Sequence, residues 1–275
     1  MSTDATLSPQ LRGALLNGLA LAPAGANVVM QLAQLPVGRG VAESRVDSGA
    51  LIKHPIKRTR TTLGYIVAVL LGDDEMREYI RREVNRQHRD VHSREGDDVA
   101  YNAFDPDLQL WVAACMYRGS LDAIALVSAH PSDDLRDELY AHCARFATTL
   151  QVPAERWPQD RGAFDEYWNE ALGLVLMDDV TREYLRGMVQ LRFLPRVLNT
   201  WLGPLHEFIV TGFLPPLFRD QLGLSWSPER QQGFDVLRRV CAAIHRVLPR
   251  ALREFPLNLV WWDTQRRYRA GRAFV

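Results

Sequence analysis

The sequence predicts one all-α domain, and three observations support this fold class. Apolar residues recur every three or four positions along most of the chain, which places them on one face of a helix. Runs that alternate apolar and polar residues, which would indicate strands, are scarce. The 275 residues are 47% hydrophobic, and no shift in composition marks a boundary between domains. We therefore expect residues 1–275 to form a single domain of about ten helices with almost no strand.

Capping residues indicate where several of the helices begin. Ser8, Ser132 and Ser227 each stand just before a periodic apolar run, where a hydroxyl can accept a backbone N–H of the first turn. Asp105 has the same position before Pro106, and proline is favoured at the first helical residue. Together with the periodic runs, these signals predict helices near residues 8–16, 28–32, 58–71, 73–92, 105–121, 132–146, 163–177, 181–191 and 227–248.

The segments between these helices are expected to be irregular. Residues 37–49 are rich in glycine and small side chains, and residues 93–102 are polar, with the best candidate for a small hairpin at 99–101. The arginine-rich tail, residues 261–275, is expected to be partly mobile. Prolines are expected to divide the part after residue 194 into short pieces. These are Pro195, Pro204, Pro215 and Pro216.

The composition excludes some classes of protein. Lysine and arginine (33 residues) balance aspartate and glutamate (33 residues), so the broad basic surface of a nucleic-acid-binding protein is not expected. Cys115, Cys143 and Cys241 lie among apolar residues without the spacing of a metal or redox motif, which favours a reducing compartment. The sequence contains no CxxCH, which excludes covalently attached haem of the c type.

The sequence does not indicate a signal peptide or a transmembrane segment. Residues 1–10 are polar where a signal peptide would be basic and then apolar. The longest uninterrupted apolar runs, such as Ile66–Leu71, are far shorter than the roughly 20 residues that cross a bilayer. We therefore expect a cytoplasmic protein. Peripheral contact with a membrane and the oligomeric state stay open.

Residues 73–92, DDEMREYIRREVNRQHRDVH, form the helix with the clearest functional signal. Met76, Ile80, Val84 and His88 recur every four residues, so they form an apolar stripe that ends in an imidazole. A buried imidazole needs partners for both ring nitrogens. A core histidine bonded to a carboxylate or a carbonyl is the commonest explanation of such a pattern. The functional explanations are a metal site and an axial ligand to haem.

The metal-site explanation would pair His88 with His92, one helical turn later. A zincin motif needs glutamate directly after the first histidine, and Arg89 stands there instead. No nearby cluster of Cys, Asp and Glu supplies a third ligand. Haem fits better, because it needs one neutral imidazole, an apolar slot and basic residues at the rim for its propionates. Lys57, Arg58 and Arg60 are the candidates for that rim.

Five stretches of the chain resemble one known family. They are residues 28–36 (VVMQLAQLP) with 40–43 (GVAE), 58–65 (RTRTTLGY), 84–92 (VNRQHRDVH), 101–106 (YNAFDP) with 110–112 (LWV), and 214–219 (LPPLFR) with 248–250 (LPR). In this order and spacing they resemble the catalytic domain shared by bacterial rubber oxygenases, or latex-clearing proteins, and the mycophenolic-acid-pathway oxygenase. The resemblance spans roughly residues 25–256.

This resemblance implies an all-α fold that binds haem b in a pocket between helices and uses it with O₂. By the family motif, His88 is the axial iron ligand, and Arg58 and Thr62 line the haem pocket. His92 stands where the family often has another basic residue. The chain departs from the family at Thr61, where rubber oxygenases have a lysine, and at Ala113, where a histidine is usual. Haem binding therefore carries over better than rubber cleavage does.

The first hypothesis is therefore a haem-dependent oxygenase acting on an apolar small molecule. His88 would hold the iron, and His88, Arg58, Thr62 and His92 would bind the cofactor. Thr61 and Thr62 are the candidate catalytic residues, because their hydroxyls lie near the expected haem, although neither is a strong base. The second hypothesis is a haem or lipid binding protein without turnover, and the third is a metal-free helical interaction module.

Overall fold

The computed structural model describes residues 7–43, 54–128 and 130–274, and within these ranges the chain forms helices and no strand. The all-α prediction is confirmed, and the only β contacts in the described ranges are two isolated antiparallel bridges, Gln34–Val175 and His92–Asn102. The α-helices are α1 (Pro9–Leu15), α2 (Ala24–Leu32), α3 (Leu35–Ala42), α4 (Pro55–Leu71), α5 (Asp74–His88), α6 (Pro106–Val127), α7 (Asp133–Thr148), α8 (Arg161–Leu172), α9 (Asp179–Val189), α10 (Arg196–Phe213), α11 (Pro216–Leu222), α12 (Pro228–Val247), α13 (Arg250–Arg253) and α14 (Leu257–Arg269). Two short 3₁₀ helices, η1 (Gly18–Leu21) and η3 (Ala154–Arg156), complete the set.

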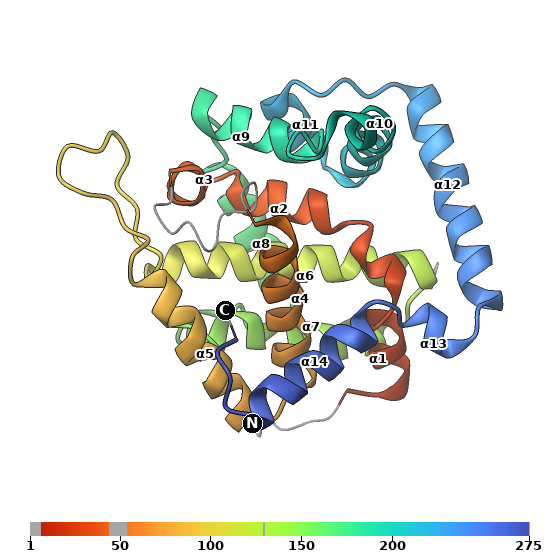
Figure 1. The fold of residues 1–275 in the computed structure, drawn as a ribbon, viewed down its shortest axis with the longest axis horizontal. Coiled ribbons are helices and arrows are strands. Elements are labelled where there is room, and N and C mark those ends of the chain that lie inside the picture. Colours follow the sequence, from red (N-terminus) through yellow and green to blue (C-terminus); the bar gives the residue numbers. More distant parts are fainter. Residues whose placement is uncertain (1–6, 44–53, 129, 275) are drawn as a thin grey trace.

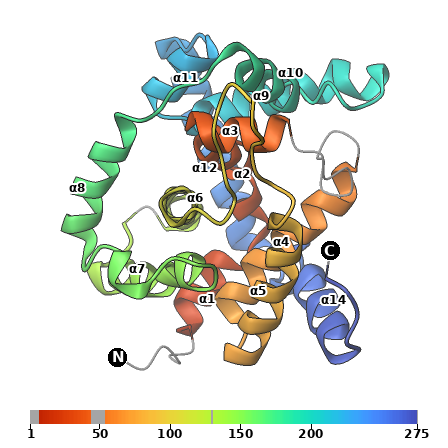
Figure 2. The same cartoon turned by 90° about the vertical axis from the view of Figure 1, so that its left-hand side faces the viewer.

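Helix α6 is the central element of the fold. It runs through the middle of the molecule and packs against α1, α2, α7 and α12 (Figure 1). Viewed along its axis, α6 has α7 below it, α8 on one side and α3 above it (Figure 2). Helices α4, α5 and α14 form a neighbouring layer, in which α4 packs against both of the others.

The core around α6 is rich in aromatic side chains. The Trp111 ring is fully buried and stacks on Trp168 of α8 with 5.1 Å between the ring centroids. Its indole N–H donates to the Gln31 carbonyl at 3.0 Å, so its polar atom is satisfied inside the core. Trp111 is therefore a packing residue of the core.

The predicted caps are present at the helix starts. The Ser8 hydroxyl accepts the Leu11 N–H at 3.1 Å. One Asp105 carboxylate oxygen accepts the N–H groups of Asp107 and Leu108, and the hydroxyls of Ser132 and Ser227 accept N–H groups in the same way. These contacts satisfy backbone donors that have no partner within the helix.

The predicted loop over residues 37–49 is wrong in its first part, and residues 44–49 lie outside the described residues. Leu35–Ala42 form helix α3 despite two glycines. A Cβ at Gly38 would lie 2.5 Å from the Thr181 side chain and 2.6 Å from the Leu32 carbonyl oxygen. Glycine is therefore required here by the close approach of α9, and it does not mark a loop.

The prediction that prolines divide the part after residue 194 is confirmed at Pro195, Pro215 and Pro216, which precede or begin α10 and α11, and is wrong at Pro204. Helix α10 continues for 18 residues with Pro204 inside it. The Asn199 amide donates to the carbonyl oxygens of Gln190 and Leu191, which ties the first half of α10 to the end of α9. These tertiary contacts stabilise a helix that its own proline weakens.

The tail after residue 261, expected to be partly mobile, is largely a helix packed on the body. Helix α14 ends at Arg269 and lies along α4. Beyond it, the Phe274 side chain is only 4% exposed, and its N–H donates to the Glu83 carboxylate at 2.7 Å. A Cβ at Gly64 of α4 would lie 2.7 Å from the Phe274 ring. Because Gly64 has no side chain, the Phe274 ring can occupy the space beside it.

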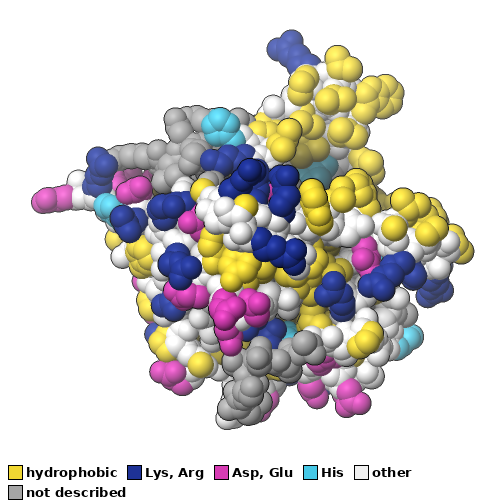
Figure 3. Space-filling view, turned by 60° about the horizontal axis from the view of Figure 1, so that its bottom comes forward, with side chains coloured by type: hydrophobic (Ala, Val, Ile, Leu, Met, Phe, Trp, Pro, Cys, Tyr) yellow, Lys and Arg dark blue, Asp and Glu magenta, His cyan; other side chains and the backbone are white. Residues whose placement is uncertain are grey.

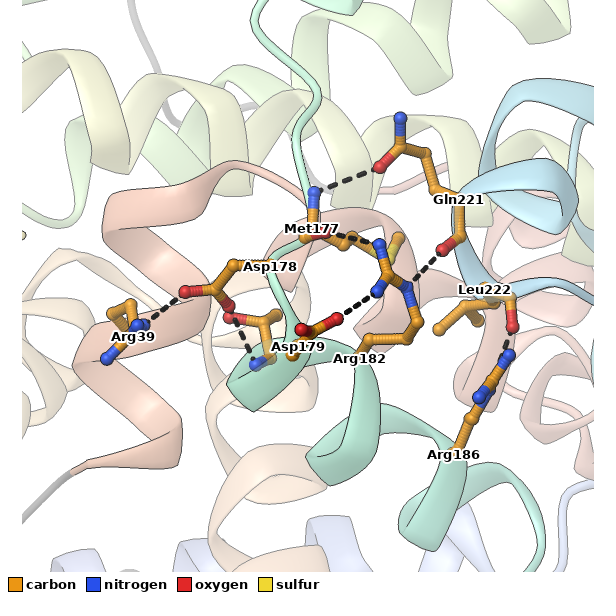
Figure 4. A network of polar contacts seen from close by, with 9 residues as sticks. Arg39, Met177, Asp178, Asp179, Arg182, Arg186, Gln221 and Leu222 are labelled. Atoms are coloured by element: carbon orange, nitrogen blue, oxygen red, sulfur yellow. Dashed lines mark hydrogen bonds and ion pairs between the residues drawn. The ribbon is translucent and has the colours of Figure 1, made fainter.

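A network of polar contacts fixes α9 against α3 and α11 (Figure 4). The Asp178 carboxylate caps α9 through the Thr181 N–H and forms an ion pair with Arg39 of α3. The Arg182 guanidinium donates to the carbonyl oxygens of Met177, at 2.8 Å, and Gln221, at 2.9 Å. The position of α9 matters for function, because its middle turn faces the candidate site described below.

Among the described residues, α6 is long and apolar enough to cross a membrane, and the bent pair formed by residues 9–15 and 18–32 meets the same criterion if it acts as one span. Within α6, 56% of the most apolar stretch is buried inside the protein. A buried core helix of a compact domain has this property as well.

Candidate functional site

Helix α5 carries the predicted apolar stripe and ends at His88. The Asp73 carboxylate accepts the Met76 N–H at 2.8 Å and so begins the helix. Met76 and Ile80 are buried, and Val84 packs against the same core. The prediction that His88 continues this stripe toward the interior is confirmed, since its Nδ1 atom is buried.

The His88 imidazole lies in an apolar environment without a hydrogen-bond partner among the described residues. Its Nδ1 atom has none, and the ring of Phe104 meets it edge-on with 6.3 Å between the centroids. Desolvation, followed by the positive charge of Arg58, lowers the pKa of His88 to about 4. The ring is therefore neutral near pH 7 and has a lone pair available for a ligand.

Arg58 lies in the first turn of α4 and approaches His88 from the neighbouring helix. Its side chain is accessible to solvent, yet burial lowers its pKa. Protein atoms therefore surround part of the Arg58 side chain, while the rest of it stays in contact with solvent. None of the ion pairs among the described residues includes Arg58. A desolvated guanidinium without a carboxylate is suited to bind an anionic group.

Tyr184 of α9 faces Arg58 and was not among the residues that sequence reasoning identified. It is half-buried, desolvation raises the pKa of its phenol, and the charge of Arg58 acts in the opposite direction. No motif marks Tyr184, because its proximity to Arg58 depends on how α9 packs against the rest of the fold. The site therefore draws on three helices, α4, α5 and α9.

The two threonines of α4 have different positions. Thr62 follows Arg58 by four residues, so both lie on the same face of the helix, and Thr62 is half-buried. Thr61 lies one position round the helix and is 7% exposed. Its hydroxyl donates to the Arg58 carbonyl at 3.0 Å, which commits its proton to the backbone.

His92 does not lie one helical turn beyond His88, because α5 ends earlier than predicted. The chain turns after His88, and the backbone then pairs with the segment around Asn102. The Ser93 N–H donates to the Tyr101 carbonyl at 2.8 Å, so the predicted hairpin is reduced to a single bridge. The His92 side chain is exposed, and its Nδ1 lies 3.1 Å from the Ser93 carbonyl oxygen. The helical geometry required for a paired His88–His92 metal site is therefore absent.

No group of three or more His, Cys, Asp or Glu side chains in the described ranges could hold a metal ion. A polar hollow of about 280 Å³ lies elsewhere, and neither His88 nor Arg58 lines it. It includes Glu43, which directly follows α3 and pairs with Arg39 of that helix. The lining residues are Arg39, Glu43, Gly96, Asp97, Asp98 and Tyr101.

His206 and Ala113 have structural roles. His206 is half-buried, and its Nδ1 lies 2.8 Å from the Val189 carbonyl oxygen, so it is a histidine with a hydrogen-bond partner. Ala113, where the resembling family usually has histidine, is 1% exposed in the core. Neither residue adds an ionisable group to the site.

Comparison with known proteins agrees with the resemblance found in the sequence. The model of the family described as "ER-bound oxygenase mpaB/B'/Rubber oxygenase, catalytic domain" matches residues 11–246. The uncharacterised proteins Mb2261 of Mycobacterium bovis and Rv2237 of Mycobacterium tuberculosis are each 45% identical over 250 residues, covering 91% of this chain and 98% of theirs. No solved structure is significantly similar to the chain. The chain therefore belongs to the family of oxygenase catalytic domains that comprises the mpaB-type and rubber oxygenases.

Proposed function

We propose that this protein is a haem b-dependent oxygenase that acts with O₂ on an apolar small molecule, with His88 as the axial iron ligand. One observation carries the proposal. A neutral, unpartnered imidazole lies beside a desolvated arginine that has no carboxylate partner in the described part of the chain. Haem b would supply both missing partners, since it combines an iron centre with anionic propionates.

The donor set at the site fits this cofactor. A structural or catalytic zinc takes three or four protein ligands, whereas haem iron takes four nitrogens from the porphyrin and needs one imidazole from the protein. His88 would be that ligand, and Arg58 would bind a propionate through charge-assisted hydrogen bonds. Bound haem would supply an iron able to activate dioxygen.

The remaining residues of the site would position the cofactor and exclude water. The Phe104 ring covers one edge of His88, and Thr62 shares the helical face of Arg58. Thr62 offers a hydroxyl to a bound group, while the Thr61 proton is already donated to the backbone. Tyr184 supplies a second hydroxyl near Arg58. His92, exposed beyond the end of α5, would contact the cofactor only at its edge.

An apolar substrate is supported by the surface near the site. Tyr184 lies on α9, and the Asn199 amide in the first half of α10 donates hydrogen bonds to the backbone at the end of α9. That half of α10 is exposed and apolar, and it projects on the same side as the start of α4 (Figure 2). The exposed fractions are Val197 76%, Leu198 50%, Trp201 78%, Leu202 43% and Leu205 51%. The free, largely buried cysteines support a reducing, cytoplasmic location.

A second candidate is a haem-binding protein without turnover. It is favoured by the Thr61 hydroxyl, which is occupied by the backbone, and by Ala113, which is buried in the core. At both positions the family that this chain resembles usually has an ionisable side chain, whereas this chain has a neutral one. The second candidate shares the haem site, so only a measurement of turnover separates the two.

The test is reconstitution of the purified protein with haem, followed by spectra of the ferric and the ferrous–CO forms. We expect a Soret band typical of histidine ligation, lost in His88→Ala and kept in the matched control His92→Ala. Oxygen consumption that depends on an added terpenoid or lipid would then support the oxygenase over the binding protein. Stoichiometric zinc or iron without haem, or ligation lost only in His92→Ala, would contradict the proposal.

A further inference from the structure

Helix α12 presents its apolar side to solvent. Val236, Val240, Ile244 and Val247 follow one another at intervals of four, four and three residues, so they form one stripe. Their exposed fractions are 50%, 49%, 52% and 82%. The opposite side of the helix contains Phe234, which is buried, and Arg238, Cys241 and His245, which are half-buried. A helix packed only for stability would bury its aliphatic stripe, so this orientation calls for a binding partner.

Further exposed apolar side chains follow along the chain beyond α12. Exposed side chains follow on α13, on the next turn and on α14, with exposed fractions of 59% for Leu252, 55% for Phe255, 55% for Leu259 and 58% for Trp262. These residues and the α12 stripe together are called the C-terminal apolar face. In the space-filling view, hydrophobic side chains with Lys and Arg beside them lie along the right-hand side of the molecule, where Figure 1 places α12, and on a projection above it, where Figure 1 places α10 (Figure 3).

The same part of the chain is strongly basic. Residues 228–275 contain ten arginines and four acidic residues, although the whole chain has 33 basic and 33 acidic residues. Arg239 and Arg246 are exposed on α12, seven residues apart, and so lie along one flank of the stripe. The Arg266 guanidinium lies 5.1 Å from the centre of the Trp262 ring. This part of the chain therefore has an excess of positive charge, and Arg239, Arg246 and Arg266 place some of it beside the exposed apolar side chains.

We propose that the C-terminal apolar face docks on the surface of an anionic lipid membrane. Aliphatic side chains and tryptophan can enter the boundary between headgroups and acyl chains, while flanking arginines bind lipid phosphates. A second copy of the chain is a less suitable occupant, because a twofold interface would bring two arginine-rich faces together. The excess of positive charge is complementary to anionic lipids.

The experiment is co-sedimentation of the full chain with vesicles of phosphatidylcholine alone and of equal parts phosphatidylcholine and phosphatidylglycerol. We expect binding to the mixed vesicles, weakened at high salt. The double variant Val240→Glu/Ile244→Glu should reduce binding at least about tenfold, because glutamate disfavours both insertion and the anionic surface. Arg239→Gln/Arg246→Gln should weaken binding to the mixed vesicles by about tenfold.

The matched control is Leu174→Glu/Leu176→Glu, which changes two exposed leucines, 68% and 54% exposed, between α8 and α9. This double variant should bind vesicles as the wild type does, and thermal unfolding should show that all variants are folded. Failure of the wild type to bind mixed vesicles would overturn the proposal, as would equal binding by Val240→Glu/Ile244→Glu. A dimer that only this variant dissociates, without vesicle binding, would identify the face as a contact between two copies instead.

Discussion

His88 and Arg58 come from different helices. In the described part of the chain, the Nδ1 atom of His88 has no hydrogen-bond partner, and Arg58 has no carboxylate partner. Desolvation and then the charge of Arg58 lower the pKa of His88 to about 4, while burial also lowers the pKa of Arg58. A buried imidazole nitrogen without a hydrogen-bond partner, beside a positive charge that lowers the pKa of the ring, is unfavourable in an ordinary core. Their proximity is therefore a property of a binding site, and the first two predictions test it.

The substitution His88→Leu in the haem-free protein should leave the free energy of unfolding within about 1 kcal/mol of wild type or raise it, because leucine removes a buried nitrogen without a partner. Urea unfolding measures this. The control is His206→Leu, which should cost about 1 kcal/mol or more, because the hydrogen bond with the Val189 carbonyl is lost. A loss above about 2 kcal/mol in His88→Leu would instead identify His88 as a core histidine with a structural partner.

The substitution Arg58→Ala should weaken haem binding without lowering the stability of the haem-free protein. A charge-assisted bond to a propionate contributes roughly 1.5–3 kcal/mol, which corresponds to about tenfold to a hundredfold in affinity. Titration of haem into the apoprotein measures this. Arg60→Ala is the control on the same helix and should have the smaller effect. Equal affinity in Arg58→Ala and wild type would mean that the cofactor lies elsewhere.

The substitution Asp178→Asn should have an effect on stability that depends on pH. Desolvation would raise the pKa of Asp178, but bonds from the Thr181 N–H and the Arg39 guanidinium outweigh it and hold the pKa below its usual value. A lowered pKa in the folded state stabilises the protein above the pKa of the unfolded state, and this contribution is lost as pH falls through the folded value.

Urea unfolding of the wild type and of Asp178→Asn should therefore differ by roughly 1 kcal/mol at pH 7, since asparagine keeps the cap but not the charge. The difference should begin to shrink as the solution is acidified below the usual pKa of an aspartate, about 4, and should disappear once the pH is below the lowered pKa of the folded state. If the wild type and Asp178→Asn differ in free energy of unfolding by the same amount at pH 7 and at acid pH, the charge of Asp178 does not stabilise the contact between α3 and α9.

The substitution Phe274→Ala should reduce the free energy of unfolding by roughly 3 kcal/mol or more, because the ring fills the space beside Gly64 and leaves a cavity when removed. Phe255→Ala is the matched control, since that ring is 55% exposed. It should cost less than about 1 kcal/mol. Similar small losses in both variants would show that the end of the chain does not contribute to the core.

Local signals in the sequence determined the fold class, most helix positions and the identity of His88. The caps at Ser8, Asp105, Ser132 and Ser227 depend only on a side chain and the backbone within three residues. The stripe that ends at His88 depends only on helical periodicity. Such features could be predicted because their interactions are complete within one or two turns of a helix.

Other features of the fold and of the site depend on contacts between distant segments, and only the tertiary structure determined them. Glycine is required at position 38 because α9 approaches α3 closely there, and the half of α10 before Pro204 is tied to the end of α9 by Asn199. Helix α5 ends at His88 because the following backbone pairs with the segment around Asn102, which leaves His92 outside the helix. The meeting of His88, Arg58 and Tyr184 depends on the packing of three helices. Local periodicity contains no information about these contacts, since their energies arise between residues far apart in the chain.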